Sequence, residues 1–451
     1  MKTDPAATRI EEDLLGSVTL PAHLEYGIQT WRACRNFPRK RQAVIGAYPN
    51  LIKGLLWIKQ AAAQANERAG YLAPAQARAI VAAADQVLEG DLEALFPVHR
   101  LHGGGGTSAN MNANEVLSRK ARQILHDAGS TEPMLPCGHV NLHQSTNDVY
   151  PAACHIATIL EWQPLHAALE ELEHALHEKA RAFAHVSRLA RTCLQDAVTM
   201  NCGDFFSAYA AVITRHRLRL NGDVDRLHSV NLGGTIIGDA SAVPAAYLDA
   251  IIPALREVSG DPAYTLHENL FDAAQNPDDM IAVASNLDSL ARSLIKIGKD
   301  IRLLASGPET GLREFLLPAV QPGSSAMPDK VNPVIPEFLI QSCMDAIGRC
   351  HAAHLALDHG ELDLNIWESL IVCNILDAMD LLEQAVLTFT ENCVMGLKVN
   401  KPVVEQYCSC TTALAEQLSR KHGYETISAL CHKARANGKS LHRVLTEAGL
   451  V

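Results

Sequence analysis

The stretch Leu287-Asp-Ser-Leu-Ala-Arg-Ser-Leu-Ile-Lys-Ile-Gly-Lys-Asp-Ile-Arg-Leu-Leu304 decides the fold class of this chain. Apolar side chains recur in it at steps of three and four, which places them on one face of a helix about five turns long. They are Leu287, Leu290, Leu294, Ile297, Ile301 and Leu304. We therefore predict a long helix with one buried face.

Two further stretches show the same period. One contains Leu165, Leu169, Leu172, Leu176 and Phe183, and the other contains Val372, Leu376, Met379, Leu382 and Val386. Three long helices with near-heptad seams predict a helical bundle, and seams this regular often continue across subunits. No alternating run of convincing length predicts a strand. We expect an all-α, or mainly α, fold.

Breaks in this periodicity near Asn141 and Asn392 divide the chain into three expected domains. Residues 1–140 mix short helices with loops and form an N-terminal mixed helical domain. Residues 141–392 form a central helical-bundle domain, and residues 393–451 form a small C-terminal helical domain.

The charge balance excludes several classes of partner. The 451 residues carry 39 Lys+Arg against 50 Asp+Glu, a net charge of −11, and no long basic run. Nucleic acid is therefore not an expected partner. No stretch approaches the roughly 18 to 20 apolar residues of a membrane span, and the start, Met1 to Glu12, is polar. We expect a cytoplasmic protein that does not enter a membrane.

Twelve cysteines are scattered from Cys34 to Cys431 in a large chain without an export signal, so reduced thiols are expected. Cys408-Ser-Cys410 has no second pair at zinc-site spacing. His351, His354 and His359 lack the pattern of a helical zinc protease. No metal site is predicted.

Four polar segments interrupt the helical pattern. The first is His102-Gly-Gly-Gly-Gly-Thr-Ser-Ala-Asn-Met-Asn-Ala-Asn-Glu115. Its glycines let backbone amides approach a ligand, and Thr107, Ser108 and the asparagines, Asn110 among them, supply neutral donors. The segment matches neither a P-loop nor a dinucleotide fingerprint. An ordinary glycine-rich turn is the alternative interpretation.

The second segment, His139-Val-Asn-Leu-His-Gln-Ser-Thr-Asn-Asp148, precedes a long helix expected to start around Pro151. Ser145, Thr146 and Asn147 lie where a helix N-terminus exposes unpaired amides, which makes this a candidate carboxylate site. The third segment, Arg191-Thr-Cys-Leu-Gln-Asp196, is a short polar interruption after a helix.

The fourth segment is Gly323-Ser-Ser-Ala-Met-Pro-Asp-Lys-Val-Asn-Pro333, which we interpret as an ordered functional loop. Its composition suits carbanion chemistry. A serine acts as a base only if its alkoxide is stabilised, and a nearby lysine with loop amides provides that stabilisation. The same lysine can bind a carboxylate whose charge grows as the proton leaves.

These segments carry a resemblance. The fourth is similar to the signature loop of the aspartase/fumarase superfamily, Gly-Ser-Ser-x-Met-Pro-x-Lys-x-Asn-Pro, with every fixed position present. The first and second resemble the family's other two conserved blocks, in order. The starts Arg9–Gly16 and Tyr26–Thr30 also resemble those of aspartases, so the resemblance covers nearly the whole chain. Gly106-Thr-Ser108 and Gln144-Ser-Thr-Asn147 resemble the aspartase branch more than the fumarases.

The resemblance implies a mainly α-helical homotetramer with a central bundle of long helices. Its active sites would be assembled from segments of three different subunits. The substrate would be a small amino acid, and no organic cofactor would be needed.

The mechanism implied by the resemblance is anti elimination through an enediolate-like intermediate. Ser324 would be the base, and Lys330 and Asn332 would bind one carboxylate. Asn147 would orient the leaving amine, with Thr192 contributing from the third segment. The carboxylate that becomes the dianion would be held by Thr107, Ser145, Thr146 and Ser325. The remaining predicted site residues are Ser108, Asn110, Cys193 and Met327.

One position departs from the family pattern. Cys193 stands where aspartases and fumarases have a histidine. A thiol is a weak donor without a positive form, and losing one charge-assisted contact costs about 1.5 to 3 kcal/mol, or roughly 10-fold to 100-fold in affinity. His143, Asp239 and Asp329 also differ from the usual residues. Together these changes predict a remodelled pocket.

Four functions are therefore open. The leading hypothesis is an aspartase-like carbon–nitrogen lyase with aspartate as its substrate. A second is an amine-lyase for a histidine-derived betaine, similar to ergothionase, because a trimethylammonium group has no N–H and does not need the missing histidine. The third is a fumarase-type hydratase, and the fourth is a non-catalytic homologue.

Overall fold

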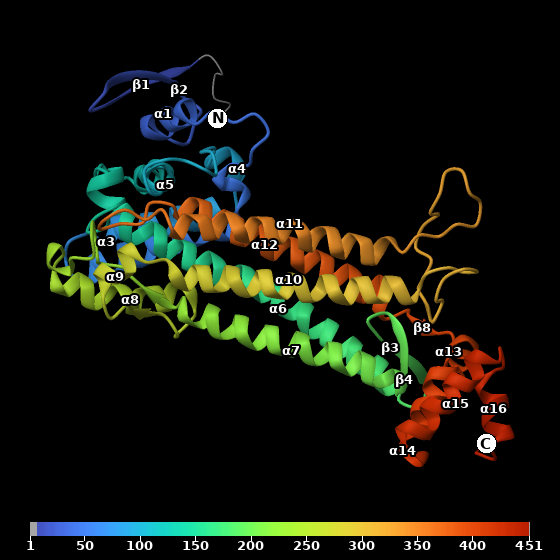
Figure 1. Ribbon diagram of the computed structural model, residues 1–451. Helices are drawn as coiled ribbons and strands as arrows, with labels where there is room; N and C mark the ends of the chain where they lie inside the picture. Colours follow the sequence, from blue (N-terminus) through green and yellow to red (C-terminus); the bar gives the residue numbers. More distant parts are fainter. Residues whose placement is uncertain (1–6, 451) are drawn as a thin grey trace. The chain divides into compact units, whose positions relative to one another are not determined.

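The computed structural model describes residues 7–450. Long helices dominate it, which confirms the predicted mainly α fold (Figure 1). Among the described residues no helix is long and apolar enough to span a membrane. The chain forms two compact units. Unit 1 joins the segment ending at Leu165 with Leu218–Ser289 and Asp345–Leu381. Unit 2 consists of His166–Arg217, Leu290–Met344 and the segment that begins at Leu382.

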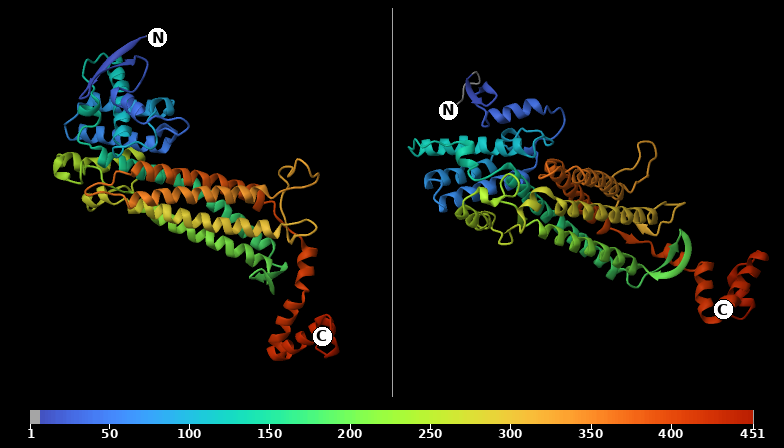
Figure 2. Two further views of the ribbon diagram at one scale, coloured as in Figure 1. Left: turned by 45° about the horizontal axis from the view of Figure 1, so that its top comes forward. Right: turned by 60° about the vertical axis from the view of Figure 1, so that its left-hand side comes forward.

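Five long helices contribute residues to both units, and within each unit their segments lie side by side (Figure 2). They are α6 (Thr146–Ala182), α7 (Cys202–Arg226), α10 (Asp278–Leu304), α11 (Val334–Leu357) and α12 (Glu368–Phe389). The division of the chain at residues 140 and 392 into three domains stays a prediction.

Unit 1 adds short strands, short helices and three longer helices before α6. These elements are β1 (Thr8–Asp13), β2 (Gly16–Pro21), α1 (Ile28–Asn36), η1 (Ile45–Ala47), α2 (Pro49–Arg68), α3 (Pro74–Leu88), α4 (Leu92–Leu95), α5 (Thr107–Asp127) and the π-helix η2 (Pro136–Val140). Further along the chain are β5 (Ser229–Val230), η3 (Ala240–Ala242), α8 (Ala245–Ser259), β6 (Thr265–Leu266) and α9 (Leu270–Gln275).

Unit 2 adds a hairpin and a group of small helices. Its elements are β3 (Ser187–Thr192), β4 (Gln195–Asn201), β7 (Phe315–Leu316), η4 (Thr390–Val394), β8 (Lys398–Val399), α13 (Lys401–Cys408), α14 (Thr411–His422), α15 (Tyr424–Ala436) and α16 (Leu441–Glu447). The last three helices enclose a small apolar core of their own, which includes Leu418, Ile427 and Leu445.

The predicted apolar faces are buried, except that Phe183, which lies just beyond the end of α6, is only partly buried. Every residue of the stripe on α10, from Leu287 to Leu304, is at most 6% exposed, and the stripe of α12 is likewise buried. The core of each unit is therefore formed by the helix faces that the sequence pattern indicates.

The predicted start of α6 around Pro151 is wrong, because the helix begins at Thr146. Proline cannot donate to the carbonyl four residues earlier, which belongs to Asn147. The side chain of Asn231 donates to that carbonyl instead, at 3.1 Å, so the backbone stays paired and the helix extends past the proline.

We expected few strands, and the described residues contain no large sheet, but the sequence did not predict the short strands that are present. The described residues contain four two-stranded sheets, of which β5–β6 is parallel and the others are antiparallel. In particular, the third polar segment is not a simple interruption after a helix. It forms the end of β3, a turn and the start of β4, with Thr192 paired to Gln195.

Candidate active site

The glycine-rich segment forms the turn that starts α5. Gly104, Gly105 and Gly106 have φ angles of 90°, 56° and 86°, a region that side chains with a Cβ rarely adopt. A Cβ on Gly106 would lie 2.3 Å from the ring of Tyr150 on α6. The hydroxyl of Thr107 donates to the Gly104 carbonyl at 2.7 Å. The turn therefore fixes the start of α5 closely against α6.

Gly106→Ala is expected to lower the free energy of unfolding by about 2 to 4 kcal/mol, because it combines a strained φ with an overlap on the Tyr150 ring. Gly104→Ala is the matched control: it has a similar φ, but its Cβ would lie 3.9 Å from Thr107. Urea unfolding of both variants measures the difference, and equal losses would contradict this role of close packing.

A group of hydrogen-bonded polar residues lies beneath the start of α6; we call Lys59, Asn110, Asn114, Asn141, Gln144 and Thr146 the Asn141 cluster. Asn141 Oδ1 accepts from Lys59 Nζ at 2.8 Å, from Asn114 Nδ2 at 3.1 Å and from Asn110 Nδ2 at 3.2 Å. Lys59 Nζ also donates to Gln144 Oε1 at 2.9 Å. One side-chain oxygen thus joins α2, α5 and the segment before α6.

The cluster ends at a predicted site residue. Asn110 Nδ2 also donates to Thr146 Oγ1, at 3.0 Å. Since this hydroxyl oxygen accepts from inside the protein, its own hydrogen remains for another acceptor. Asn110 Oδ1 is buried without a hydrogen-bond partner among residues 7–450.

Ser145 and Asn147 flank Thr146 at the start of α6, as predicted. Ser145 Oγ accepts from the Asn147 amide at 3.3 Å, and the Ser145 amide donates to Asp148 Oδ1 at 2.9 Å. Asp148 Oδ2 accepts from the amides of Gly233 and Thr235 at 3.0 and 3.2 Å. Unit 1 therefore brings Asn110, Ser145, Thr146 and Asn147 together at one helix N-terminus, which favours a bound anion.

Two buried ionisable groups accompany this helix end. Burial lowers the pKa of Lys59 to about 7, although the charge of Asp148 opposes that shift. Burial raises the pKa of Asp148 to about 6, against the opposing effect of its amide hydrogen bonds and of Lys59. A neutral lysine still has two hydrogens for its two acceptors, so the cluster keeps its geometry in either charge state.

Lys59→Met is expected to change how stability depends on pH. Because the pKa of Lys59 is lower in the folded chain than its ordinary 10.5, the unfolded chain alone holds that proton between about pH 7 and 10.5. Raising the pH through this window therefore stabilises the folded wild type, by at most about 1.4 kcal/mol per pH unit. The variant lacks this increment.

Urea unfolding at several pH values in this window measures the effect. The control is Lys53→Met, which removes a lysine of the same helix that lies over the Trp57 ring. Parallel pH dependence in wild type and Lys59→Met would contradict the shifted lysine.

The fourth polar segment, residues 323–333, forms an ordered loop in unit 2, which we call the Ser324 loop. Its ends are joined where the Gly323 amide donates to the Lys330 carbonyl at 2.8 Å and Asn332 Nδ2 donates to the Gly323 carbonyl at 2.7 Å. A Cβ on Gly323 would lie 2.4 Å from the Asn332 nitrogen, so this closure requires glycine.

Inside the loop, Ser324 Oγ accepts from the amides of Met327 and Ala326 at 2.9 and 3.2 Å. Two amides directed at this oxygen favour negative charge on it. Ser324, Met327, Asp329 and Lys330 line one cavity of about 500 Å³. The side chain of Lys330 is exposed, and its ammonium group has no hydrogen bond or ion pair within the described part of the chain, so its charge is available to a ligand. Ser325 is exposed and does not line this cavity.

Thr107 and Ser108 face a different cavity of about 500 Å³ in unit 1, together with Gln29 and Arg32. Arg32 donates to both carboxylate oxygens of Asp13, at 2.8 and 2.9 Å. The residues of the first polar segment therefore lie in two places. Asn110 belongs to the Asn141 cluster, while Thr107 and Ser108 face a cavity in which the guanidinium of Arg32 is paired with Asp13.

Cys193 lies at the two-residue turn between β3 and β4. Cys193 and Leu194 have φ angles of 53° and 59°, which is the geometry of a type I′ hairpin turn. The preceding strand is anchored by Arg188 and Arg191, which both pair with the fully buried carboxylate of Glu314. Thr192 and Cys193 are thus presented on an exposed, firmly held turn.

The predicted site residues fall into two sets, one in each compact unit. Unit 1 contains Thr107, Ser108, Asn110, Ser145, Thr146 and Asn147; unit 2 contains Thr192, Cys193, Ser324, Ser325, Met327, Lys330 and Asn332. Within unit 2 the hairpin turn does not contribute to the cavity of the Ser324 loop.

The sequence did not identify Lys59, Asn141, Asp148 and Arg32 as members of these sites, and it identified Asn114 only as one of the asparagines of the first segment. A signal existed for Lys59, which is the one charged residue within the mainly apolar stretch Leu55 to Ala63. No signal indicated that Asn141 accepts three hydrogen bonds, because its donors come from α2 and α5.

All twelve cysteines are free thiols in the structure. Over residues 7–450, no group of three or more histidine, cysteine, aspartate or glutamate side chains is arranged to hold a metal ion.

Comparisons with known proteins agree with this architecture. The sequence profile of a family described as Lyase matches residues 16–348. The chain is 37% identical over 449 residues to aspartate ammonia-lyase from Bacillus subtilis (strain 168), covering 98% of this chain and 94% of that protein. It is also 37% identical over 451 residues to fumarate hydratase class II from Thermosynechococcus vestitus, covering 100% and 95%.

Among solved structures, the chain resembles fumarate lyase:delta crystallin from Brucella melitensis bound to cobalt. The TM-score is 0.92 and the identity is 38%, over 99% of this chain and 96% of that chain.

Proposed function

The chain belongs to the aspartase/fumarase superfamily of lyases, and we propose that it is an aspartase-like carbon–nitrogen lyase. In this proposal it eliminates ammonia from an aspartate-type amino acid and yields fumarate or a related unsaturated acid. The observation that carries the proposal is the Ser324 loop, in which two amides meet the serine oxygen and an unpaired Lys330 lines the same cavity.

The proposed reaction begins with binding of the two carboxylates. Lys330 and Asn332 hold one, while the helix start at Ser145 and Thr146, with Thr107 and Ser325, holds the other. Ser324, as alkoxide, takes the proton next to the second carboxylate, and the developing dianion is stabilised by neutral donors and the helix N-terminus. The amine, oriented by Asn147, then leaves from the neighbouring carbon.

We propose further that the chain acts as a homotetramer in the cytoplasm, with each active site shared among three subunits. The support is that the two sets of site residues belong to different compact units of one chain, so neighbouring subunits can supply complementary sets. Sedimentation equilibrium of the purified protein tests the tetramer, and a stable active monomer would contradict it.

Similarity to known proteins does not distinguish ammonia release from hydration, because an aspartate ammonia-lyase and a fumarate hydratase match this chain at the same identity. The aspartase-type residues Ser108 and Thr146 favour ammonia release. Parallel assays on L-aspartate and L-malate test this choice. Fumarate formed faster from malate would assign the chain to the hydratases instead.

Cys193 favours one alternative substrate class, the histidine-derived betaines whose trimethylammonium group has no N–H. Release of trimethylamine from such a betaine, together with no product from L-aspartate, would support that alternative. Absence of both amine and unsaturated product from betaines would exclude it.

If L-aspartate is the substrate, Cys193→His is expected to raise kcat/KM for it by about 10-fold to 100-fold, because it adds a charge-assisted donor at the exposed turn. Histidine tolerates the positive φ at this position better than most residues. Cys137→His, at another exposed cysteine, is the control. An unchanged or lower value on aspartate would indicate that the pocket is built for a different amine.

A further inference from the structure

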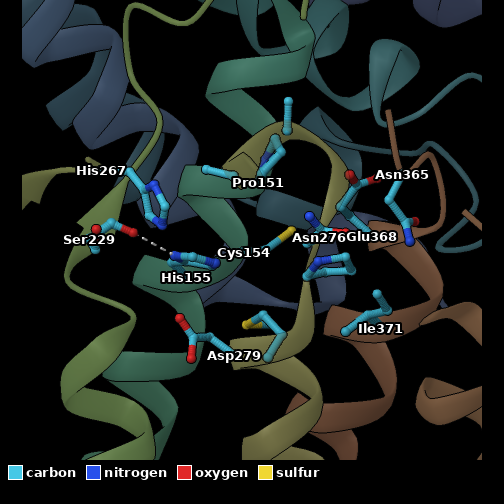
Figure 3. A pocket seen from close by; sticks show the side chains of 14 residues that line it. Pro151, Cys154, His155, Ser229, His267, Asn276, Asp279, Asn365, Glu368 and Ile371 are labelled. Carbon is cyan, nitrogen blue, oxygen red and sulfur yellow. Dashed lines mark hydrogen bonds between the residues drawn. The ribbon is translucent and has the colours of Figure 1, made fainter. Parts of the chain in front are cut away.

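A second cavity in unit 1 is lined by none of the predicted site residues. Its volume is about 40 Å³, and it lies between α6, the segment joining α9 to α10, and the start of α12. Figure 3 shows His155, Ser229 and His267 on one side of it and Asn276, Glu368 and Asn365 on the other. Cys154 lies between these two sides.

Glu368, the first residue of α12, carries a carboxyl group with one unsatisfied oxygen in this cavity. It is 8% exposed, and its Oε2 is buried without a hydrogen-bond partner among the described residues. No lysine, arginine or histidine pairs with Glu368 in that part of the chain, and its own backbone amide is the group that offsets the effect of burial on its pKa. Burial raises its pKa to about 8. A buried, unpaired carboxylate is costly, so a cationic partner would be strongly favoured here.

His155 contributes an acceptor. Its Nδ1 lies 3.2 Å from the carbonyl oxygens of both Leu227 and Ser229, and because carbonyls only accept, Nδ1 carries the hydrogen. Burial lowers the pKa of this imidazole, which favours its neutral form. Nε2 then has a lone pair and no hydrogen.

Other polar side chains that line the cavity have partners of their own. His267 Nδ1 lies against the backbone carbonyl and amide of Asn269. Asn276 Nδ2 donates to the Asp272 carboxylate, so Asn276 Oδ1 remains available as an acceptor. Asn365 Nδ2 donates to the Ala356 carbonyl, and Asn365 Oδ1 accepts from the Trp367 amide. Asp279 is paired with Arg226. The cavity therefore offers a carboxylate and neutral acceptors.

Size and chemistry together select the ligand. A water molecule needs roughly 10 to 15 Å³ of such space, so about 40 Å³ admits an ion of a few atoms but not an amino acid. A nitrogen lone pair is a good acceptor for N–H but a poor ligand for alkali cations, which prefer oxygen. We propose that this cavity binds an ammonium ion, held by Glu368 with His155 Nε2 and Asn276 Oδ1 as further acceptors.

The inference rests on this cavity and not on chemistry at Ser324. If the lyase proposal is correct, however, ammonium is a product of the reaction, and the site would respond to product concentration. A Ser324→Ala protein keeps the cavity intact, so its ammonium binding is expected to equal that of the wild type even when turnover is lost.

The test uses the purified full chain near pH 8 and compares ammonium chloride with potassium and sodium chloride at equal ionic strength. Wild type is expected to show a saturable rise of about 2 °C or more in its thermal midpoint with ammonium alone. Glu368→Gln, which keeps the shape and removes the charge, should weaken ammonium binding about 10-fold to 100-fold. Glu309→Gln, at an exposed carboxylate, should behave as wild type.

Equilibrium dialysis of wild type against ¹⁵N-ammonium is an independent measurement that needs no variant, and about one retained ion per chain at saturation supports the proposal. An equal rise with potassium chloride would overturn the assignment to ammonium. An unaltered ammonium response in Glu368→Gln, or no saturable response in wild type, would overturn the site itself.

Discussion

Ser324→Ala is expected to form the unsaturated acid roughly 100-fold to 10,000-fold more slowly than wild type, the range by which a positioned general base accelerates proton transfer. The structural reason is that Ser324 Oγ is the oxygen towards which the Met327 and Ala326 amides are directed. An alanine leaves those amides without their acceptor and leaves the substrate proton without a base. Ultraviolet absorbance of the conjugated product measures the rate.

Ser325→Ala is the matched control, because Ser325 is the neighbouring serine, is exposed and does not line the cavity. Its expected loss is that of one neutral hydrogen bond to substrate, about 3-fold to 10-fold. Equal losses in the two variants would mean that the loop binds substrate through both serines without either acting as base. Full activity in Ser324→Ala would remove Ser324 from the mechanism.

Asn141→Leu is expected to lower both stability and activity. The substitution removes the acceptor for Lys59, Asn110 and Asn114, which are all buried. Each buried donor left without a partner costs about 1 to 3 kcal/mol, so the free energy of unfolding should fall by about 3 kcal/mol or more. Since Asn110 also positions Thr146, kcat/KM should fall as well.

Asn141→Asp separates the acceptor role of this side chain from its bulk. An aspartate keeps the acceptor oxygens and adds a charge opposite Lys59, while it loses the donation to the Gln144 carbonyl. Urea unfolding should therefore show a smaller loss than for leucine. Identical losses in the two variants would contradict the view that the cluster depends on acceptors at position 141.

The helical stripes were predictable because a period of three to four residues is a local property, and their burial on α10 and α12 follows it closely. The start of α6 was not predictable in the same way. Pro151 marks a helix boundary by local rules, but the side chain of Asn231, about 80 residues away, supplies the hydrogen bond that the proline cannot make.

The β3–β4 hairpin was missed for a related reason. Two-residue hairpin turns usually contain Asn-Gly or Gly-Gly, which makes them recognisable in a sequence. Here the turn residues are Cys193 and Leu194. The pairing of Arg188 and Arg191 with buried Glu314 holds the strand from a distance in sequence. Long-range contacts of this kind leave no local pattern.

For the candidate site, sequence motifs located the segments but not their internal contacts. Ser145, Thr146 and Asn147 lie at a helix start as the motif indicated. Lys59 stayed unidentified because a lysine in an apolar stretch has no meaning until its acceptors, Asn141 and Gln144, are placed around it.

The most direct test of the lyase assignment is the stoichiometry of products from L-aspartate. Purified protein is incubated with L-aspartate, and ammonia and fumarate are quantified in the same samples over time. We expect the two products to appear together in a one-to-one ratio. Absence of both, from protein shown to be folded and tetrameric, would contradict the assignment to aspartate and direct attention to the amines that a pocket with Cys193 accepts.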